Sequence, residues 1–271
     1  MSLWSEVTTA HIWLRMVAVA GAYGLLFLLA ETTRRKLGAS GETTRKLVHV
    51  SGGLLALALP YVLESPWQVV GLAAGFVVLL VATGRFGGLP SIHAISRPSA
   101  GAYLYPIAIA ATFTLARDDR LGYVVALLAL TLGDAAAGLF GQRYGRRGFS
   151  VWGQSRTIEG SLAAFAFTVG ATLAVLSLSS QGPSAVVATA LEVGLVVALI
   201  EAASPWGSDN LTVPLAALAV YTAAGSGPLA LLVLTGSAAL LAAGLAASRR
   251  TGPEPHLDAS NGVPLEGSRG P

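Results

Sequence analysis

Carboxylates, arginines and glycines gather in one stretch of the chain, residues 132–161, which reads LGDAAAGLFGQRYGRRGFSVWGQSRTIEGS. Asp134 lies near the end of a long apolar run, and Glu159 opens the next apolar run. An ionisable side chain inside a membrane segment is costly to bury and usually marks a functional site. Between the two acids, the loop supplies fixed positive charges from Arg143, Arg146, Arg147 and Arg156. Together these residues predict a site for a bound polyanion and its metal ion.

The glycines of this stretch allow two interpretations. At Gly133, Gly141 and Gly145 the backbone could approach a ligand closely, because glycine carries no side chain. Small residues also pack helices against one another in membranes, and GDAAAG alone would justify only that interpretation. Thr157 with Glu159 resembles a helix N-terminus, where backbone N–H groups and the helix dipole favour a bound phosphate.

Two further polar groups flank apolar runs elsewhere in the chain. Arg45, Lys46 and His49 precede the second run, and their spacing places Arg45 and His49 on one helix face, one turn apart. The alternative is a purely structural role. Arg45 and Lys46 would then anchor the helix end, and His49 would be a polar residue whose hydrogen bonds are made within the bundle. Asp209 stands in SDNLTVP before the eighth run, where it could bind a ligand or simply cap a helix.

The composition predicts a membrane protein. Of 271 residues, 54% are hydrophobic and 11% are charged, whereas an average soluble domain has about 25% charged residues. The chain has no cysteine, which excludes disulfides, thiolate metal sites and cysteine nucleophiles. The basic residues lie in short loops between apolar runs, as topology signals do, so we expect a lipid bilayer and no nucleic acid as partner.

We predict an all-α, polytopic transmembrane bundle of about nine spans. Residues 1–248 would form a single transmembrane domain, and residues 249–271 a disordered cytoplasmic tail rich in Pro, Gly and Ser. The apolar runs cover residues 13–30, 48–63, 67–83, 102–116, 121–140, 158–178, 185–203, 211–224 and 228–247.

The basic residues predict the orientation of the bundle. With nine spans, fourteen of the seventeen Lys and Arg residues fall on one side, in loops 31–47, 84–101 and 141–157 and in the tail. The positive-inside rule then places the N-terminus outside and the C-terminus in the cytoplasm. The protein would be a multi-pass integral membrane protein, in the cell membrane if it is bacterial, with its site on the cytoplasmic side.

Four motifs resemble the membrane polyprenol kinases, a family that comprises dolichol kinase, phytol and farnesol kinases, and the CTP-dependent diacylglycerol kinase. They are RKLVH at 45–49, LGDAAAGLFGQRYGRR at 132–147, RTIEGSLAAF at 156–165 and SDNLTVP at 208–214, in the family's order. The resemblance implies transfer of the terminal phosphoryl group of CTP to a lipid alcohol such as phytol, a polyprenol or diacylglycerol. The family commonly has Lys where this chain has Arg156, and a guanidinium clamps phosphate differently from an ammonium.

The resemblance and the residue chemistry together predict the members of the site. The predicted catalytic residues are Arg45, Lys46, His49 and Asp134. The nucleotide would be bound within 133–161 by Gly133, Gly141, Arg143, Gly145, Arg146, Arg156, Thr157, Glu159, Gly160 and Ser161. Magnesium, which prefers carboxylate oxygens, would be held by Asp134, Glu159 and Asp209.

Phosphoryl transfer fits these residue types, because it requires mainly positioning and neutralisation of charge. A standard P-loop is excluded, since GxxxxGK[ST] is absent and the only lysines are Lys36 and Lys46. We predict that Arg143 and Arg156 clamp phosphates, and that His49 or one of the acids takes the hydroxyl proton.

Two other functions remain open at the level of sequence. A cytidylyltransferase that forms a CDP-linked lipid would use the same metal and charge chemistry, but it would release pyrophosphate instead of CDP. A transporter would use Asp134, Glu192 and Glu201 as a proton or ion path. The gathering of polar motifs at one face favours an enzyme, because transporter sites lie near the midplane of the membrane.

Overall fold

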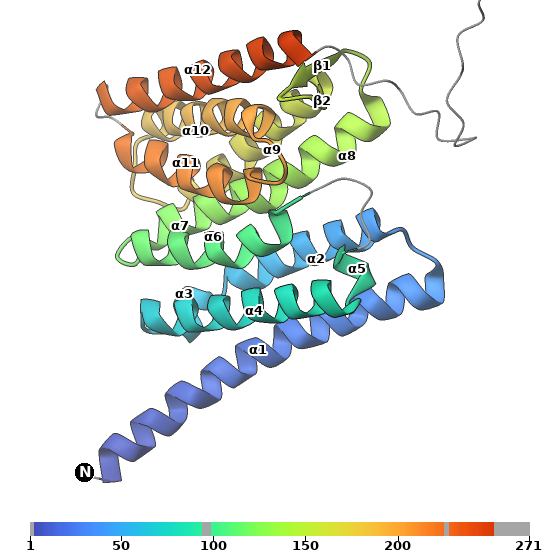
Figure 1. Ribbon diagram of the computed structural model, residues 1–271. Coiled ribbons are helices and arrows are strands. Elements are labelled where there is room, and N and C mark those ends of the chain that lie inside the picture. Colours follow the sequence, from blue (N-terminus) through green and yellow to red (C-terminus); the bar gives the residue numbers. More distant parts are fainter. Residues whose placement is uncertain (1–2, 94–98, 225–227, 252–271) are drawn as a thin grey trace, which may run out of the picture.

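A computed structural model describes residues 3–93, 99–224 and 228–251 of the chain. The helices lie side by side in one bundle, with α1 along one edge and α12 along the opposite edge (Figure 1). Every apolar run predicted from the sequence is mainly helical in its described part, and the run 48–63 is divided between two helices, Gly41–Ala56 and Leu59–Val62. The predicted tail falls largely outside the described residues, and its first residues, 249–251, belong to α12 (Pro228–Thr251).

The first half of the chain forms the lower part of the bundle in Figure 1. Ser40 caps α2 by accepting a hydrogen bond from the Thr43 N–H at 3.1 Å, and Ser65 and Gln68 form a capping box that starts α4. The helices are α1 (Leu3–Leu37), α2 (Gly41–Ala56), α3 (Leu59–Val62), α4 (Pro66–Phe86), α5 (Pro90–His93) and α6 (Gly101–Leu115).

The second half forms the upper part of the bundle and carries most of the predicted site. A π-helical turn, η1, joins α7 to α8 within one continuous helical stretch, residues 120–144. The elements are α7 (Arg120–Leu128), η1 (Ala129–Gly133), α8 (Asp134–Tyr144), β1 (Gly148–Val151), β2 (Gln154–Thr157), α9 (Ile158–Leu176), α10 (Pro183–Ala203), α11 (Asp209–Ala223) and α12.

The structure confirms the predicted helical bundle and adds one short hairpin. Residues 148–157, expected to be a loop, form an antiparallel hairpin in which Phe149 pairs with Arg156 and Val151 pairs with Gln154. Trp152 and Gly153 both have positive φ, 53° and 76°, which matches the right-handed twist of a tight two-residue hairpin. The hairpin fixes the position of Arg156, as described below.

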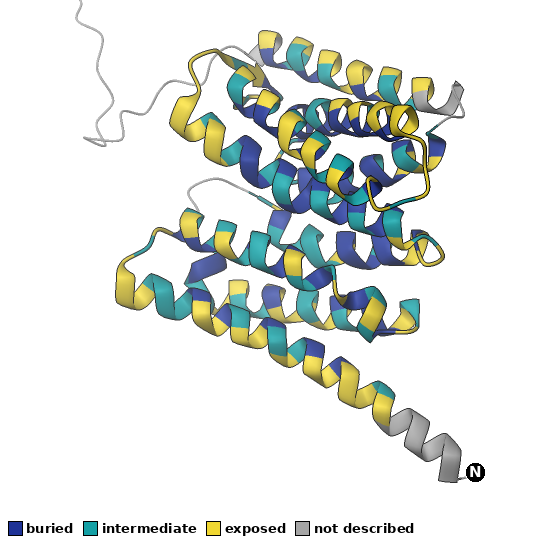
Figure 2. Ribbon diagram, turned by 180° about the vertical axis from the view of Figure 1, so that it is seen from behind, coloured by how far each residue is buried: buried dark blue, intermediate teal, exposed yellow. Residues whose placement is uncertain are grey.

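The surface of the bundle is apolar, as expected for helices in a membrane. Leu14, Val17 and Leu28 on α1 are each more than 60% exposed, and exposed residues run along the outer faces of α1 and α12 in Figure 2. Among the described residues, six helices are long and apolar enough to cross a membrane. The protein is therefore a multi-pass helical membrane protein, while the count of nine spans stays a prediction, because helices such as α6 and α11 have 15 residues.

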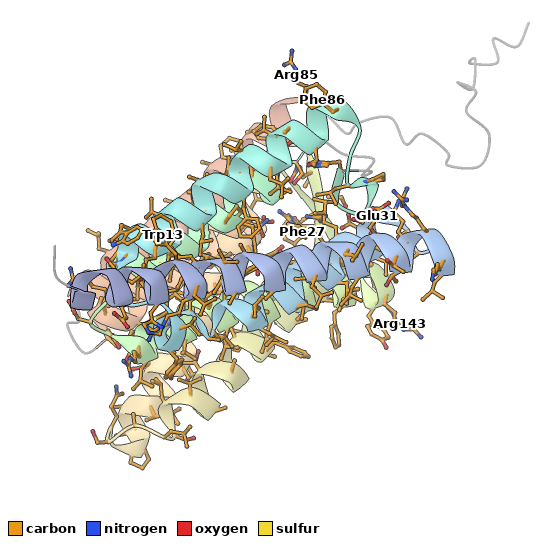
Figure 3. The ribbon with its side chains drawn as sticks, turned by 90° about the horizontal axis from the view of Figure 1, so that it is seen from below. Trp13, Phe27, Glu31, Arg85, Phe86 and Arg143 are labelled. Carbon is orange, nitrogen blue, oxygen red and sulfur yellow. The ribbon has the colours of Figure 1, made fainter. Side chains whose placement is uncertain are left out.

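Several charged side chains lie at the two ends of the bundle. Arg15, Arg117 and Arg120, the three basic residues outside the predicted basic side, line one polar surface cleft of about 490 Å³. At the other end lie the C-terminal ends of α1, α4 and α8, and Figure 3 shows Arg85 and Arg143 on this side and Trp13 on the opposite side. The predicted orientation of the bundle, including the side that faces the cytoplasm, stays a prediction.

Candidate active site

Helix α2 supplies the first polar face of the site. Arg45 and His49 lie one turn apart, as predicted, and both line the same pocket. Glu42 pairs with the guanidinium of Arg45 at 2.9 Å. Lys46 also lines this pocket, and a Cβ atom added at Gly138 of α8 would lie 3.1 Å from its Nζ atom. The sequence-predicted catalytic residues on α2 therefore face the N-terminal half of α8.

The π-helical turn η1 places Asp134 opposite His49. The Nε2 atom of His49 lies 3.1 Å from the Leu130 carbonyl within η1 and 3.4 Å from Oδ2 of Asp134. A carbonyl only accepts hydrogen bonds, so Nε2 carries a hydrogen and His49 donates toward α8. Single π turns inside α-helices are frequent at functional sites. Here the turn aligns a backbone carbonyl and a carboxylate on one imidazole.

Three carboxylates from separate helices converge beside His49. Asp134, Glu201 and Asp209, called the acid cluster below, offer oxygen atoms that all lie within 4.8 Å of one another. Asp134 opens α8, Glu201 lies in the last turn of α10, and Asp209 opens α11. Glu201 and Asp209 are buried. Such a set of hard oxygen donors fits a divalent cation such as Mg²⁺.

Arg156 lies within the acid cluster. Its NH1 atom lies 3.0 Å from Oε1 of Glu201, and its NH2 atom lies 3.6 Å from Oδ2 of Asp209. NH2 also donates to the Ser204 carbonyl at 2.7 Å. The Arg156 guanidinium therefore contacts two of the three carboxylates of the acid cluster.

The hairpin carries Arg156 to this position. Trp152 at the tip donates its backbone N–H to Gly244 of α12 at 3.2 Å and its indole N–H to the Ala203 carbonyl of α10 at 2.9 Å. The Gly153 N–H donates to Ser248 Oγ at 2.8 Å. These contacts hold the tip of the hairpin against α10 and α12, so Arg156 on β2 reaches the end of α10.

The segment before α11 positions Asp209 by a close backbone contact. Gly207 has φ +83°, and a Cβ atom there would lie 2.6 Å from the Gly101 nitrogen. Asn210 donates its side-chain N–H to the Gly101 carbonyl at 2.8 Å, which ties α11 to α6. Asp209 is the first residue of α11 rather than its cap, which is Ser208. Burial, together with the nearby Asp134 carboxylate, raises the pKa of Asp209 to about 6.

A polar cleft of about 610 Å³ adjoins the acid cluster. It lies between the start of α2, α8, β2 and the start of α9, and its lining includes Arg156 and Glu201. Thr157 caps α9 by accepting a hydrogen bond from the Gly160 N–H at 3.1 Å. Four predicted nucleotide-binding residues besides Arg156 line this cleft: Gly141, Thr157, Gly160 and Ser161.

Two predicted glycines serve helix packing. A Cβ atom at Gly133 would lie 2.7 Å from Thr168 Oγ1 of α9, and one at Gly145 would lie 2.6 Å from Cγ2 of Thr157, the cap of α9. Even in the cleft, a Cβ atom at Gly160 would meet the Ala137 carbonyl at 2.9 Å. Close packing of α8 on α9 therefore accounts for part of the glycine pattern.

Other predicted residues lie apart from the acid cluster. Arg143 and Arg146 are exposed and line neither the polar cleft nor the pocket at His49, and the Arg143 guanidinium lies over the Tyr144 ring. Glu159 accepts a hydrogen bond from the Arg147 N–H at 3.3 Å and is not in the acid cluster. Glu201 takes the place in the acid cluster that the sequence assigned to Glu159.

The sequence of this chain is similar to that of a characterised kinase. The chain is 31% identical over 209 residues to a phytol kinase from Synechocystis sp., and the match covers 75% of this chain and 88% of that protein. The chain belongs to the polyprenol and phytol kinase family. No family model and no solved structure matches the chain. Membership in the polyprenol and phytol kinase family confirms the resemblance drawn from the four motifs. Each of the four contributes one side chain to the acid cluster or to its neighbours Arg156 and His49.

Proposed function

We propose that this protein transfers the terminal phosphoryl group of a nucleoside triphosphate, CTP by resemblance, to the hydroxyl group of a membrane lipid alcohol. The observation that carries this proposal is the convergence of the acid cluster with Arg156 beside a polar cleft. Phosphoryl transfer needs mainly a cation-binding acid group and fixed positive charges around the phosphates. The phytol kinase relative supports the same class of reaction.

The polar cleft is the place we assign to the nucleotide. Its volume of about 610 Å³ falls in the range of small-molecule sites. The N-terminus of α9, a helix of 19 residues, opens into it at Thr157 and Gly160, and such a terminus favours phosphate groups. Arg156 lines both this cleft and the pocket at His49, so its guanidinium can contact a phosphate chain that passes from one to the other.

The acid cluster would hold Mg²⁺ through Asp134, Glu201 and Asp209. When bound, the ion would neutralise charge on the phosphate oxygens. With the cation bound, the three carboxylates would no longer depend on Arg156 to balance their charge. The Arg156 guanidinium could then turn partly from Glu201 and Asp209 to contact phosphate.

The chain's own residues can accept the proton that the reaction releases. The alcohol oxygen forms a bond to the terminal phosphorus, the bond from that phosphorus to the bridging oxygen breaks, and the nucleoside diphosphate leaves. We assign the hydroxyl proton to Asp134, because this carboxylate belongs to the acid cluster and also faces His49. His49 donates from Nε2 toward Leu130 and Asp134, so it orients the carboxylate and does not accept the proton at that atom.

We place the reaction on the cytoplasmic side of a bundle with nine spans, an extracellular N-terminus and a cytoplasmic C-terminus. This placement is supported by the position of the site at the end of the bundle that holds most of the basic residues, because basic residues favour the cytoplasmic side of a membrane.

The test is alcohol-dependent formation of nucleoside diphosphate by the protein purified in detergent. CTP, ATP, GTP and UTP are compared with Mg²⁺, each with and without phytol, a polyprenol or diacylglycerol. We expect the diphosphate to form only when an alcohol is present and fastest with CTP. A folded protein that produces no diphosphate with any combination would refute the proposal, and release of pyrophosphate would identify a cytidylyltransferase.

A further inference from the structure

A second polar cleft lies at the end of the bundle away from the acid cluster. Its volume is about 490 Å³, and it is bounded by α1, α3, the start of α4 and the turn between α6 and α7. The first residue of α6, Gly101, is tied to Asn210 beside the acid cluster, whereas Phe113 in the last turn of α6 lines this second cleft. The 15 residues of α6 therefore separate the two sites by about 22 Å.

Three arginines from separate parts of the chain converge on this cleft, called the arginine cleft below. Arg15 lies in α1, Arg117 in the turn after α6, and Arg120 is the first residue of α7. They are the only Lys or Arg residues of the sequence that stand outside the basic loops and the tail. Anchoring of separate helix ends would not by itself bring all three to one cleft. Their convergence indicates a site for an anion, since guanidinium groups bind phosphate and carboxylate strongly.

The ion pairs within the arginine cleft leave its guanidinium groups accessible. Arg15 pairs with Glu64, and the Nε atom of Arg117 lies 3.5 Å from the Asp118 carboxylate. In both pairs the carboxylate is more exposed than the guanidinium side chain, 69% against 44% in the first pair and 89% against 64% in the second. Exposed pairs of this kind contribute little to stability. An incoming anion can therefore replace the two carboxylates as the partner of these arginines.

Arg120 is oriented in the arginine cleft by an aromatic ring. Its guanidinium carbon lies 5.4 Å from the centre of the Tyr61 ring. This cation–π contact uses the face of the ring and holds the guanidinium in place. A guanidinium has five N–H donors in a rigid fork that matches two oxygens of a phosphate group. Arg120 can therefore present such a fork to a bound phosphate.

The surroundings of the arginine cleft are typical of the membrane–water interface. Trp13 and Trp67 pack edge-on with ring centroids 6.1 Å apart and are 55% and 50% exposed, and Figure 3 shows Trp13 at this end of the bundle. Tyr61, which lines the cleft, is 69% exposed. Trp and Tyr are enriched where lipid headgroups meet the hydrocarbon core. Leu14 and Val17, close to Arg15 in α1, are each 65% exposed and offer an apolar surface beside the cleft.

We propose that the arginine cleft binds the phosphate group of an anionic phospholipid, with the acyl chains of this lipid along the exposed apolar face of α1. The cleft has a volume in the range of small-molecule sites, which exceeds the needs of a single phosphate ion and accommodates a phosphoglycerol headgroup. The bound lipid would join α1 to the turn between α6 and α7 and thereby stabilise the bundle. This inference does not depend on the proposed kinase reaction.

The first test measures binding of a defined lipid. The full-length protein in a neutral detergent is titrated with phosphatidylglycerol or with zwitterionic phosphatidylcholine. Bound lipid is counted by native mass spectrometry, and the melting temperature is recorded in parallel. We expect phosphatidylglycerol to be retained and to raise the melting temperature, because a ligand that binds only the folded state stabilises it, and we expect phosphatidylcholine to do neither. Equal effects of the two lipids would overturn the proposal.

The second test removes two arginines from the cleft and two from elsewhere. Arg117→Gln/Arg120→Gln should raise the Kd of the tightest phosphatidylglycerol site by about tenfold. Arg34→Gln/Arg35→Gln, which removes the same charge at the opposite end of α1, should leave that Kd within about twofold of the wild type. Equal losses in the two variants would indicate a general attraction to basic residues and would overturn the proposal. Arg117→Gln alone replaces the double variant if the latter does not fold.

The third test identifies the source of the phosphate and the place where it binds. Inorganic phosphate and glycerol phosphate are added at millimolar concentration to the protein loaded with phosphatidylglycerol, and we expect neither to displace the lipid. Displacement would assign the cleft to a soluble anion and overturn the lipid assignment. A phosphatidylglycerol with a diazirine on its headgroup should label residues 60–66 and 113–123, and labelling confined to other segments would contradict the site. None of these measurements requires turnover, so failure of the kinase proposal would leave their outcome unchanged.

Discussion

At the scale of single residues, the site depends on side chains that are far apart in the sequence. Asp134, His49, Arg156 and Asp209 could be predicted, because each stands in a short polar motif beside an apolar run. Glu201 could not be assigned to the metal site, since its local sequence, ALIEAASP, shows only an acid at a helix end. Its contribution depends on the packing of α10 beside the hairpin and α11, which no local pattern encodes.

Glu201→Gln tests the composition of the acid cluster. The change keeps the shape of the side chain but removes a charge that faces Arg156 at 3.0 Å and belongs to the proposed cation site. We expect kcat/KM to fall by about 100-fold or more, the usual size of losing a preorganised charge at a reacting phosphate. Initial rates over a range of Mg²⁺ concentrations measure this loss. Glu192→Gln on the same helix is the control. It should keep at least half of the wild-type rate, because the proposed kinase reaction does not use Glu192.

Arg156→Lys tests the clamp. Arginine contacts Glu201, Asp209 and the Ser204 carbonyl through two nitrogens, and a single ammonium cannot reproduce this fork. We expect KM for the nucleotide to rise about tenfold, while Arg156→Gln, which removes the charge, loses at least a further tenfold in kcat/KM. Steady-state kinetics of both variants measure these changes in KM and kcat/KM. Equal rates for Lys and Gln would show that the charge at this position is not used.

At the scale of elements, the helices could be predicted and the hairpin could not. Long apolar runs predict helices well, because the period and length of the pattern extend over many residues. The two strands are only four residues each, within a stretch rich in Gly and Arg that resembles a loop. The available signal is the Trp-Gly pair between GFSV and QSRT, since a glycine in a two-residue connection is typical of a tight hairpin.

Trp152→Ala tests whether the hairpin positions Arg156. The change removes the indole N–H bond to the Ala203 carbonyl and the packing against α12. We expect a loss of about 2 kcal/mol of unfolding free energy from the lost burial and hydrogen bond, together with a fall in kcat/KM of about tenfold. Trp67→Ala, which breaks the Trp13–Trp67 contact away from the site, should lower thermal stability and leave kcat/KM unchanged. A Trp152 variant with full activity would show that Arg156 holds its place without the hairpin tip.

At the scale of the whole molecule, the helical bundle agrees with the sequence, whereas the number of spans and the orientation stay predictions. In the described part of the chain, six helices are long and apolar enough to span a membrane. The helices α2, α6 and α11, with 16, 15 and 15 residues, are shorter than the roughly 20 residues of a perpendicular span. Their apolar composition predicts membrane embedding, but their length also fits burial within the bundle.

The absence of cysteine makes the orientation directly testable. Single cysteines are introduced at Arg85, at the basic end of α4, and at Asp118, whose side chain is 89% exposed at the opposite end. We expect a membrane-impermeant maleimide to label Asp118→Cys in intact cells and Arg85→Cys only after permeabilisation. The reversed pattern would invert the orientation, and labelling of both in intact cells would contradict the segregation of the two ends.

The most direct test of the central claim follows the phosphorus atom that reaches the lipid. The purified protein is incubated with Mg²⁺, phytol and CTP that carries its label either in the terminal phosphate or in the phosphate next to the ribose, and the extracted lipid is counted. The account predicts label in the lipid only from the terminal phosphate, and none when Asp134 is replaced by Asn in a protein of unchanged melting temperature. Label from the phosphate next to the ribose, or undiminished transfer by Asp134→Asn, would contradict it.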